Sequence, residues 1–333
     1  MRRCGRISVF SALVLALGHT AFAGDIIDAT GRSIKLAEPL TRIAAAGPPA
    51  EVLLYALAPD AMIGWVRPLS PRIASYMSPE VRALPAIGGV TAQGEAPEIP
   101  DILAAKPQMI LDFGDIDPRY TALAAKMQER TGVPYVLLDG ALDKTPEILR
   151  AVGKLTGRAE RGEALAVYAA DMLARAKKIA AAHADKPAKA YIARNADGSY
   201  TAMPGTHGGD IYDLAGLKNI AQYADTTPVQ VQDWDPDVII ALDAKFNDTT
   251  KGPAWANVRA VKTGHVIMPP RLPWGWTDHP PSINRLIGVL WLTSAVYGEP
   301  SAAGLKDETA RFYKMFFHVD LTPSQLADML ETK

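Results

Sequence analysis

The stretch RAERGEALAVYAADMLARAKKIAAAHAD, residues 158–185, sets the architecture that we predict for this chain. It contains no proline, is rich in alanine and predicts one helix that ends before Lys186-Pro187. A helix of about 25 residues is roughly 37 Å long, enough to lie along two lobes. Its apolar side chains recur at steps of three or four residues, at Leu165, Tyr168, Met172, Ala176 and Ile179. An ordinary surface helix of a single domain is the alternative.

Short apolar runs on both sides of this helix predict two parallel β-sheets. Runs of consecutive apolar residues between helical patterns are typical of strands buried on both faces. The expected fold is α/β, with two doubly wound lobes at 24–157 and 186–333 joined by one long helix at 158–185. The expected strands are residues 42–45, 62–65, 109–111, 135–138, 190–193, 238–241 and 265–268.

The first 23 residues have the features of a secretory signal peptide. Three arginines precede an apolar core at residues 9–17, and Ala21-Phe22-Ala23 offers a small-x-small cleavage site. We expect cleavage after Ala23 and a periplasmic location. The only cysteine, Cys4, lies in this peptide, so the mature chain can form neither a disulfide nor a zinc–thiolate site.

The charge balance argues against nucleic acid as a partner. The chain has 35 basic and 36 acidic residues, and removal of three arginines with the signal peptide leaves 32 against 36. No basic stripe remains to attract nucleic acid or anionic lipid. No later apolar run reaches the ~20 residues that a membrane helix needs. We expect an exported monomer.

An aromatic loop that leads into a helix carries the clearest functional signal. Residues 271–292 begin with Trp274 and Trp276 beside Asp278 and His279, and become helical after Pro281. Large aromatics at the mouth of a helix suit contact with a flat or apolar ligand. The alternative is that the two indoles cover an apolar patch of the protein itself.

The pattern W-x-D-x-P-P-S-x-N-R-L-x-G-x-x-W-L, residues 276–292, resembles the C-terminal lobe of periplasmic iron-complex and cobalamin binding proteins. The resemblance extends from Asp25 to about Pro300 and implies two lobes joined by a helix, with the ligand in the cleft between them. It implies the substrate-binding component of an ABC importer, with a metal chelate as ligand and an inner-membrane permease as partner. No resident cofactor is expected.

Within this frame, candidate ligand contacts lie at strand ends and in the loops that follow them. Aromatic rings would supply stacking area, and cationic side chains would neutralise an anionic chelate. The candidates are Trp65, Arg67, Phe113, His207, Lys245, Trp274, Trp276, Asp278, His279 and Arg285. The resemblance also makes Glu51 the candidate for docking onto the permease, although a carboxylate in the first turn of a helix is favoured in any case. Residues 228–234 offer no matching glutamate in the second lobe.

The sequence is compatible with several ligands. No two of the histidines after residue 23 have the spacing of a local metal site, which disfavours a free metal ion as ligand. His207 and His279 are the candidates for completing the coordination of a chelated metal. An iron–siderophore complex is the expected ligand, with heme, cobalamin and a molybdate-type oxyanion as alternatives. A periplasmic hydrolase that uses Asp278 and His279, or a sensor, is the alternative of another class.

Overall fold

The computed structural model describes residues 22–37, 39–90 and 99–330. Residues 1–21 of the predicted signal peptide lie outside this part, while its last two residues fall in strand β1 (Phe22–Ile27). β1 pairs antiparallel with β2 (Ser33–Ala37) and forms an entry hairpin ahead of the first lobe. Within the described residues, no helix combines the length and the apolar character that crossing a membrane requires.

The first lobe is built on a parallel sheet of three strands in the order β3-β4-β5. The strands are β3 (Ile43–Ala45), β4 (Met109–Gly114) and β5 (Tyr135–Asp139). The helices around them are α1 (Pro48–Leu57), η1 (Pro59–Ala61), α2 (Pro71–Ala74), α3 (Pro79–Arg82), α4 (Ile99–Ala104), α5 (Pro118–Thr131), η2 (Leu142–Lys144) and α6 (Thr145–Leu155).

One expected strand, residues 62–65, is not a strand in the structure. Met62 forms an isolated parallel bridge with Ile43, and Trp65 forms another with Ala86. The backbone thus changes its partner from β3 to residues 85–87 within three residues, which prevents a continuous ladder. The other six predicted strands coincide with strands of the structure.

The second lobe is built on a parallel sheet of four strands in the order β7-β6-β8-β9. The strands are β6 (Lys189–Ala193), β7 (Lys218–Asn219), β8 (Val238–Ala241) and β9 (Val266–Ile267). Its helices are α8 (Asp210–Leu214), α9 (Pro228–Trp234), α10 (Phe246–Thr249) and α11 (Arg259–Lys262). The doubly wound α/β plan predicted from the apolar runs is therefore confirmed for both lobes.

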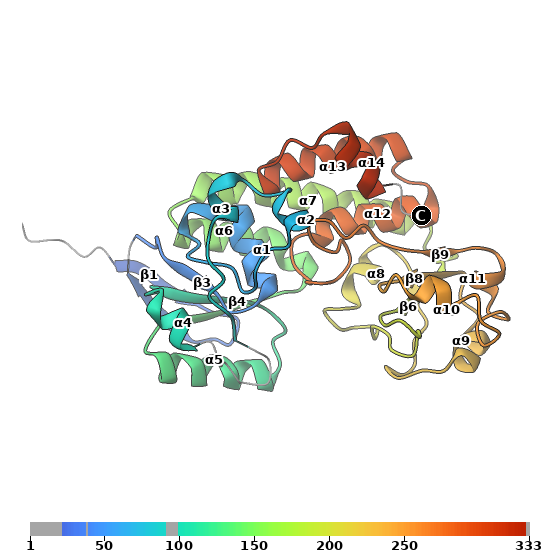
Figure 1. Ribbon diagram of the computed structural model, residues 1–333, viewed down its shortest axis with the longest axis horizontal. Coiled ribbons are helices and arrows are strands. Elements are labelled where there is room, and N and C mark those ends of the chain that lie inside the picture. Colours follow the sequence, from blue (N-terminus) through green and yellow to red (C-terminus); the bar gives the residue numbers. More distant parts are fainter. Residues whose placement is uncertain (1–21, 38, 91–98, 331–333) are drawn as a thin grey trace, which may run out of the picture.

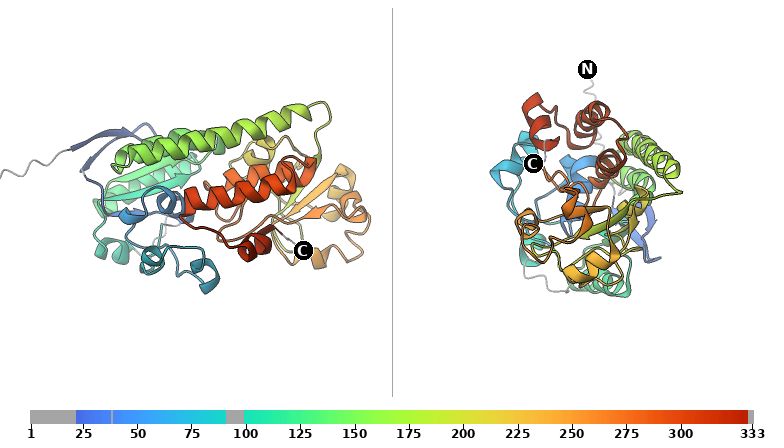
Figure 2. Two further views of the ribbon diagram at one scale, coloured as in Figure 1. Left: turned by 90° about the horizontal axis from the view of Figure 1, so that it is seen from above. Right: turned by 90° about the vertical axis from the view of Figure 1, so that its right-hand side faces the viewer.

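A layer of long helices joins the lobes along one side (Figure 1). It consists of α7 (Ala159–Ala182), α12 (Arg285–Tyr297) and α13 (Ala302–Phe317), followed by the short α14 (Pro323–Leu330). Figure 2 shows α7, in green, running along most of the molecule beside the orange-red helices. The connecting helix expected at 158–185 is present, but it belongs to a layer rather than standing alone.

Helix α13 packs on the first lobe although it comes last in the chain. The Tyr55 hydroxyl on α1 donates a hydrogen bond of 2.5 Å to the carbonyl oxygen of Phe317, and the two rings are stacked. The guanidinium of Arg161 on α7 donates to the carbonyl oxygen of Met315 at 2.8 Å. The predicted division at residue 186 therefore does not describe how the C-terminal helices pack.

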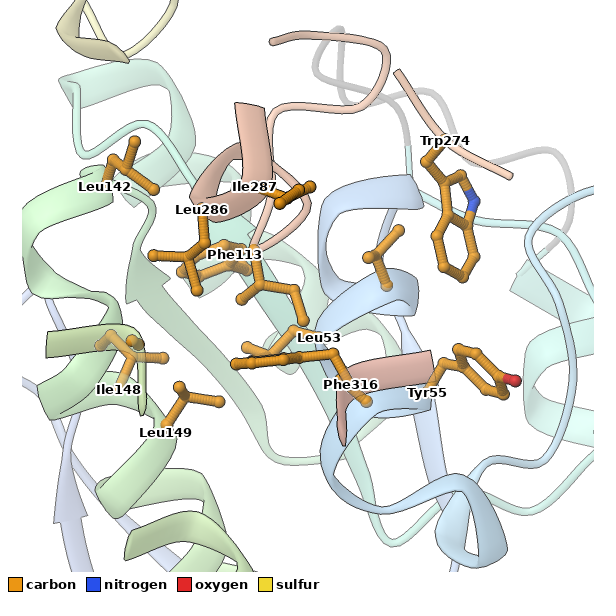
Figure 3. Packing of buried hydrophobic residues seen from close by; sticks show 14 of the residues in the cluster. Leu53, Tyr55, Phe113, Leu142, Ile148, Leu149, Trp274, Leu286, Ile287 and Phe316 are labelled. Atoms are coloured by element: carbon orange, nitrogen blue, oxygen red, sulfur yellow. The ribbon is translucent and has the colours of Figure 1, made fainter. Parts of the chain in front are cut away.

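The hydrophobic core continues from the first lobe into this helical layer. Figure 3 shows Leu53 and Tyr55 of α1 facing the same apolar interior as Leu286, Phe316 and Trp274. Since interiors are close-packed, a shared core resists sliding of one layer over another. The core thus fixes α12, and with it the residues at its N-terminal end, against the first lobe.

Candidate functional site

A cavity of about 430 Å³ lies between the two lobes, and we call it the inter-lobe cavity. Most of its wall comes from the first lobe, at the carboxyl ends of β3, β4 and β5, where parallel α/β sheets usually bind ligands. The second lobe and α12 close it from the other side. Its lining residues are Ala46, Gly47, Pro48, Pro49, Val66, Arg67, Gly89, Val90, Asp112, Phe113, Gly114, Asp115, Tyr120, Leu123, Gly140, His207, Pro281 and Arg285.

Arg285 ties the two sides of the inter-lobe cavity together. The side chain is 1% exposed, and its guanidinium donates to the carbonyl oxygen of Gly140 in the first lobe at 2.7 Å. It also donates to the carbonyl oxygen of His207 at 2.5 Å and forms an ion pair with Asp210. Its Nε has no hydrogen-bond partner within the described residues. A buried cation with one unused donor therefore stands in the wall of the cavity.

Arg67 is the accessible cation of the same cavity. Its side chain is exposed, and it has no acidic partner among residues 22–37, 39–90 and 99–330. An unpaired guanidinium can offer two parallel N–H donors to a carboxylate or another oxyanion. Arg67 therefore offers an unpaired positive charge to the space, whereas the charge of Arg285 is balanced by Asp210.

The carboxylates in the wall are held by the protein itself. Burial raises the pKa of Asp112, although the Tyr135 hydroxyl at 2.7 Å and the backbone N–H of Phe113 at 2.9 Å act to lower it. The hydrogen bond to His207 lowers the pKa of Asp115. Asp112 is thus hydrogen-bonded within the protein and Asp115 is paired with His207, whereas Arg67 has no acidic partner among the described residues.

Four of the predicted ligand residues meet in this cavity: Arg67, Phe113, His207 and Arg285. Phe113 is the second-last residue of β4, and His207 lies in the loop ahead of α8. The rule that ligand contacts lie at strand ends therefore identified residues of one cavity that are more than two hundred positions apart in the sequence.

The three tryptophans predicted as ligand contacts, Trp65, Trp274 and Trp276, lie in the core and not on the cavity wall. Trp276 is 0% exposed and its indole N–H donates to the Tyr313 hydroxyl at 3.0 Å. Trp274 packs edge-on against Phe317, with 4.9 Å between ring centroids, and the indole N–H of Trp65 donates to the carbonyl oxygen of Val81 at 2.8 Å. These indoles therefore do not line the inter-lobe cavity, because Trp274 and Trp276 pack against α13 and Trp65 packs against Tyr55 of α1.

The remaining candidates also lie outside the inter-lobe cavity. Lys245 is exposed at the start of α10. Asp278 is buried in an ion pair with Arg194, and its other oxygen accepts the backbone N–H of His279 at 2.8 Å. Neither carboxylate oxygen of Asp278 accepts a hydrogen bond from the imidazole ring of His279. Asp278 and His279 are therefore not arranged as the acid and base of a hydrolase.

Glu51 is buried, which removes it from the docking surface in this structure. The side chain is 6% exposed, and its carboxylate accepts the backbone N–H of Val66 at 2.5 Å. Burial raises its pKa to about 7, with Val66 and the charge of Arg67 opposing the rise. The residue therefore supports the loop that carries Arg67 instead of facing a partner.

Sequence reasoning missed the acidic and phenolic members of the wall, Asp112, Asp115 and Tyr120. The rule that ligand sites form at the carboxyl ends of parallel strands could have found the two aspartates, because both lie at or just after the end of β4. Over the described parts of the chain, no three histidine, cysteine or acidic side chains are grouped as metal ligands. Both ring nitrogens of His207 face carboxylates, so neither is free for a metal.

The chain is similar to a known protein family and to solved structures. The family model described as "Periplasmic binding protein" matches residues 71–271. A solved ABC transporter solute binding protein from Sulfurospirillum deleyianum is 26% identical, with a TM-score of 0.82, and the match covers 93% of this chain and all of that one (100%). No curated protein sequence matches the chain.

Two further solved structures share the fold at lower identity. The molybdate periplasmic binding protein MolA of Haemophilus influenzae is 19% identical over 90% of this chain and 99% of its own, with a TM-score of 0.70. An ABC-type Fe3+-hydroxamate transport protein from Saccharomonospora viridis is 18% identical over 82% of this chain and 98% of its own, with a TM-score of 0.61. These similarities establish the fold alone.

Proposed function

This chain belongs to the periplasmic binding protein family, and from that premise we propose that it captures an anionic iron–siderophore complex for an ABC importer. The ligand would be held in the inter-lobe cavity and handed to an inner-membrane permease. The observation that carries the proposal is the cavity itself, which has a guanidinium on each side and belongs to both lobes.

The charge and shape of the cavity support an anionic, compact ligand. Arg67 can donate charge-assisted hydrogen bonds to oxyanion groups of a chelate, and the buried guanidinium of Arg285 lies in the same wall. The partly buried ring of Tyr120 supplies apolar contact to the organic part, and Phe113 supports the wall from the core. A volume of about 430 Å³ lies in the lower half of the range for small-molecule sites, which favours a compact chelate over cobalamin.

A free oxyanion such as molybdate is the second candidate. It is favoured by the same compactness and by the two guanidiniums, which could satisfy a small anion without aromatic contact. The two candidates differ in their need for Tyr120, whose ring is only partly buried. Tyr120→Ala should weaken an organic chelate strongly and a small oxyanion little, because only the chelate has apolar surface to bury.

Calorimetric titration of ligand-stripped residues 24–333 tests the proposal. The panel would contain ferric catecholate and hydroxamate siderophores, heme, cobalamin, molybdate and free iron. We expect saturable binding of an anionic siderophore complex, weakened at least about tenfold by Arg67→Ala through loss of a charge-assisted contact of about 1.5–3 kcal/mol. Arg72→Ala removes an exposed arginine outside the cavity and is the matched control. Equal affinity of the two variants, or no binding of any anionic ligand, would overturn the assignment.

A further inference from the structure

The loop that carries His207 reaches from the second lobe to two carboxylates of the first. Asp115 follows β4, and Asp139 is the last residue of β5. His207 lies ahead of α8 and lines the inter-lobe cavity. We propose that His207, Asp115 and Asp139 form a proton-dependent latch that holds the two lobes together without any ligand. The latch goes beyond the proposed function, since it does not depend on what the cavity binds.

The geometry of the ring indicates which protonation state closes the latch. Nδ1 of His207 lies 2.5 Å from Oδ1 of Asp115, and Nε2 lies 3.2 Å from Oδ1 of Asp139. A neutral imidazole carries a hydrogen on only one nitrogen and would set a lone pair against one of these carboxylates. Only the imidazolium can face both oxygens with N–H groups. The arrangement is therefore complete only when His207 is protonated.

The charges around the ring agree with this assignment. Three carboxylates face it, from Asp115, Asp139 and the start of α8 at Asp210. Two nearby cations form ion pairs of their own, Arg285 with Asp210 and Arg194 with Asp278. Besides the hydrogen bond to His207, the charge of Arg119 lowers the pKa of Asp115, and Lys177 lines a neighbouring recess. The hydrogen bond to Asp115 raises the pKa of His207, and burial opposes the rise.

Two other contacts between the lobes do not use this histidine side chain. The backbone N–H of Leu142 donates to Asp210 at 2.8 Å, and Arg285 donates to the carbonyl oxygen of Gly140 at 2.7 Å. These contacts form a constant part of the closure, whereas the His207 contacts can be switched by a proton. Loss of the latch should therefore loosen the lobes without separating them.

The sign of the pH effect follows from linkage. Closure raises the pKa of His207, so the stabilisation of the closed form is fully present below the ordinary histidine value of about 6.5. It is lost as the pH rises through the higher value of the closed form. The lobes should thus be closer at mildly acidic pH than at alkaline pH, in protein that carries no ligand.

The distance between the lobes can be measured by pulsed electron–electron double resonance (DEER) on ligand-stripped protein. Residues 22–333 contain no cysteine, so one spin label can be placed on each lobe through Lys126→Cys in α5 and Gln232→Cys in α9. Both positions are exposed. Between pH 5.5 and 9 we expect the mean distance to lengthen. In His207→Gln it should take the longer value at every pH, because glutamine cannot donate to both carboxylates as a cation.

A second variant protects the test against a folding defect. Asp115→Asn combined with Asp139→Asn keeps His207 and removes its partners, and it should also abolish the pH dependence. His265→Gln and Asp143→Asn alter exposed groups without such contacts and should behave as the wild type. Cooperative thermal unfolding establishes that each variant is folded. A wild-type inter-lobe distance that does not change with pH, or a pH dependence that is still present in both latch variants, would overturn the proposal.

Discussion

Replacing Glu51 with glutamine should stabilise the protein at alkaline pH. The side chain lies in the first turn of α1, almost fully buried, and accepts the backbone N–H of Val66 at 2.5 Å. Burial raises its pKa from 4.5 to about 7, which corresponds to about 3 kcal/mol of free energy. Since the folded state binds the proton more tightly, this contribution is fully present below pH 4.5 and is lost as the pH rises through about 7. Glutamine keeps the acceptor oxygen and carries no charge.

Unfolding temperatures measured from pH 5 to 9 give the test. At pH 8 to 9 the Glu51→Gln variant should be more stable than the wild type by up to about 3 kcal/mol, and near pH 5 the two should nearly coincide. Glu129→Gln changes an exposed glutamate of α5 and should follow the wild type throughout. If the wild type and the Glu51→Gln variant unfold in parallel at every pH, the buried-carboxylate reasoning fails.

Three further predictions concern the packing that positions the cavity. Trp276→Ala should cost about 3–5 kcal/mol in unfolding free energy through loss of a buried indole, while calorimetry on the folded variant should find ligand affinity preserved. Arg285→Met should destabilise by about 3–5 kcal/mol, because Asp210 loses its buried partner; an unchanged melting temperature would contradict the contact. Gly288→Ala should destabilise by at least about 1–3 kcal/mol in denaturant unfolding, because its Cβ would lie 1.8 Å from the carbonyl oxygen of Trp276.

The sequence predicts the architecture well because the signals are periodic and local. A run of 28 residues without proline predicts a helix at 158–185, and the structure has one at Ala159–Ala182. Consecutive apolar residues at 190–193 and 238–241 predict strands that are indeed buried in a parallel sheet. The strand expected at 62–65 fails, because pairing depends on partners that a local pattern does not contain.

The site is predicted less completely because burial is decided by distant parts of the chain. The indoles of Trp274 and Trp276 look available for a ligand until α13 packs over them, and nothing in residues 271–292 indicates that contact. Glu51 looks like a surface residue for the same reason. The cations Arg67 and Arg285 could be found, since each lies beside a recognisable loop-to-helix or strand-end signal.

The position of the iron in crystals of the ferric-siderophore complex shows whether the inter-lobe cavity is the binding site. Anomalous scattering at the iron edge places the metal without assuming how the chelator is oriented. We expect one strong peak inside the inter-lobe cavity, between Arg67, Phe113 and His207. A peak beside the loop of Trp274 and Trp276, or on the outer surface of either lobe, would contradict it.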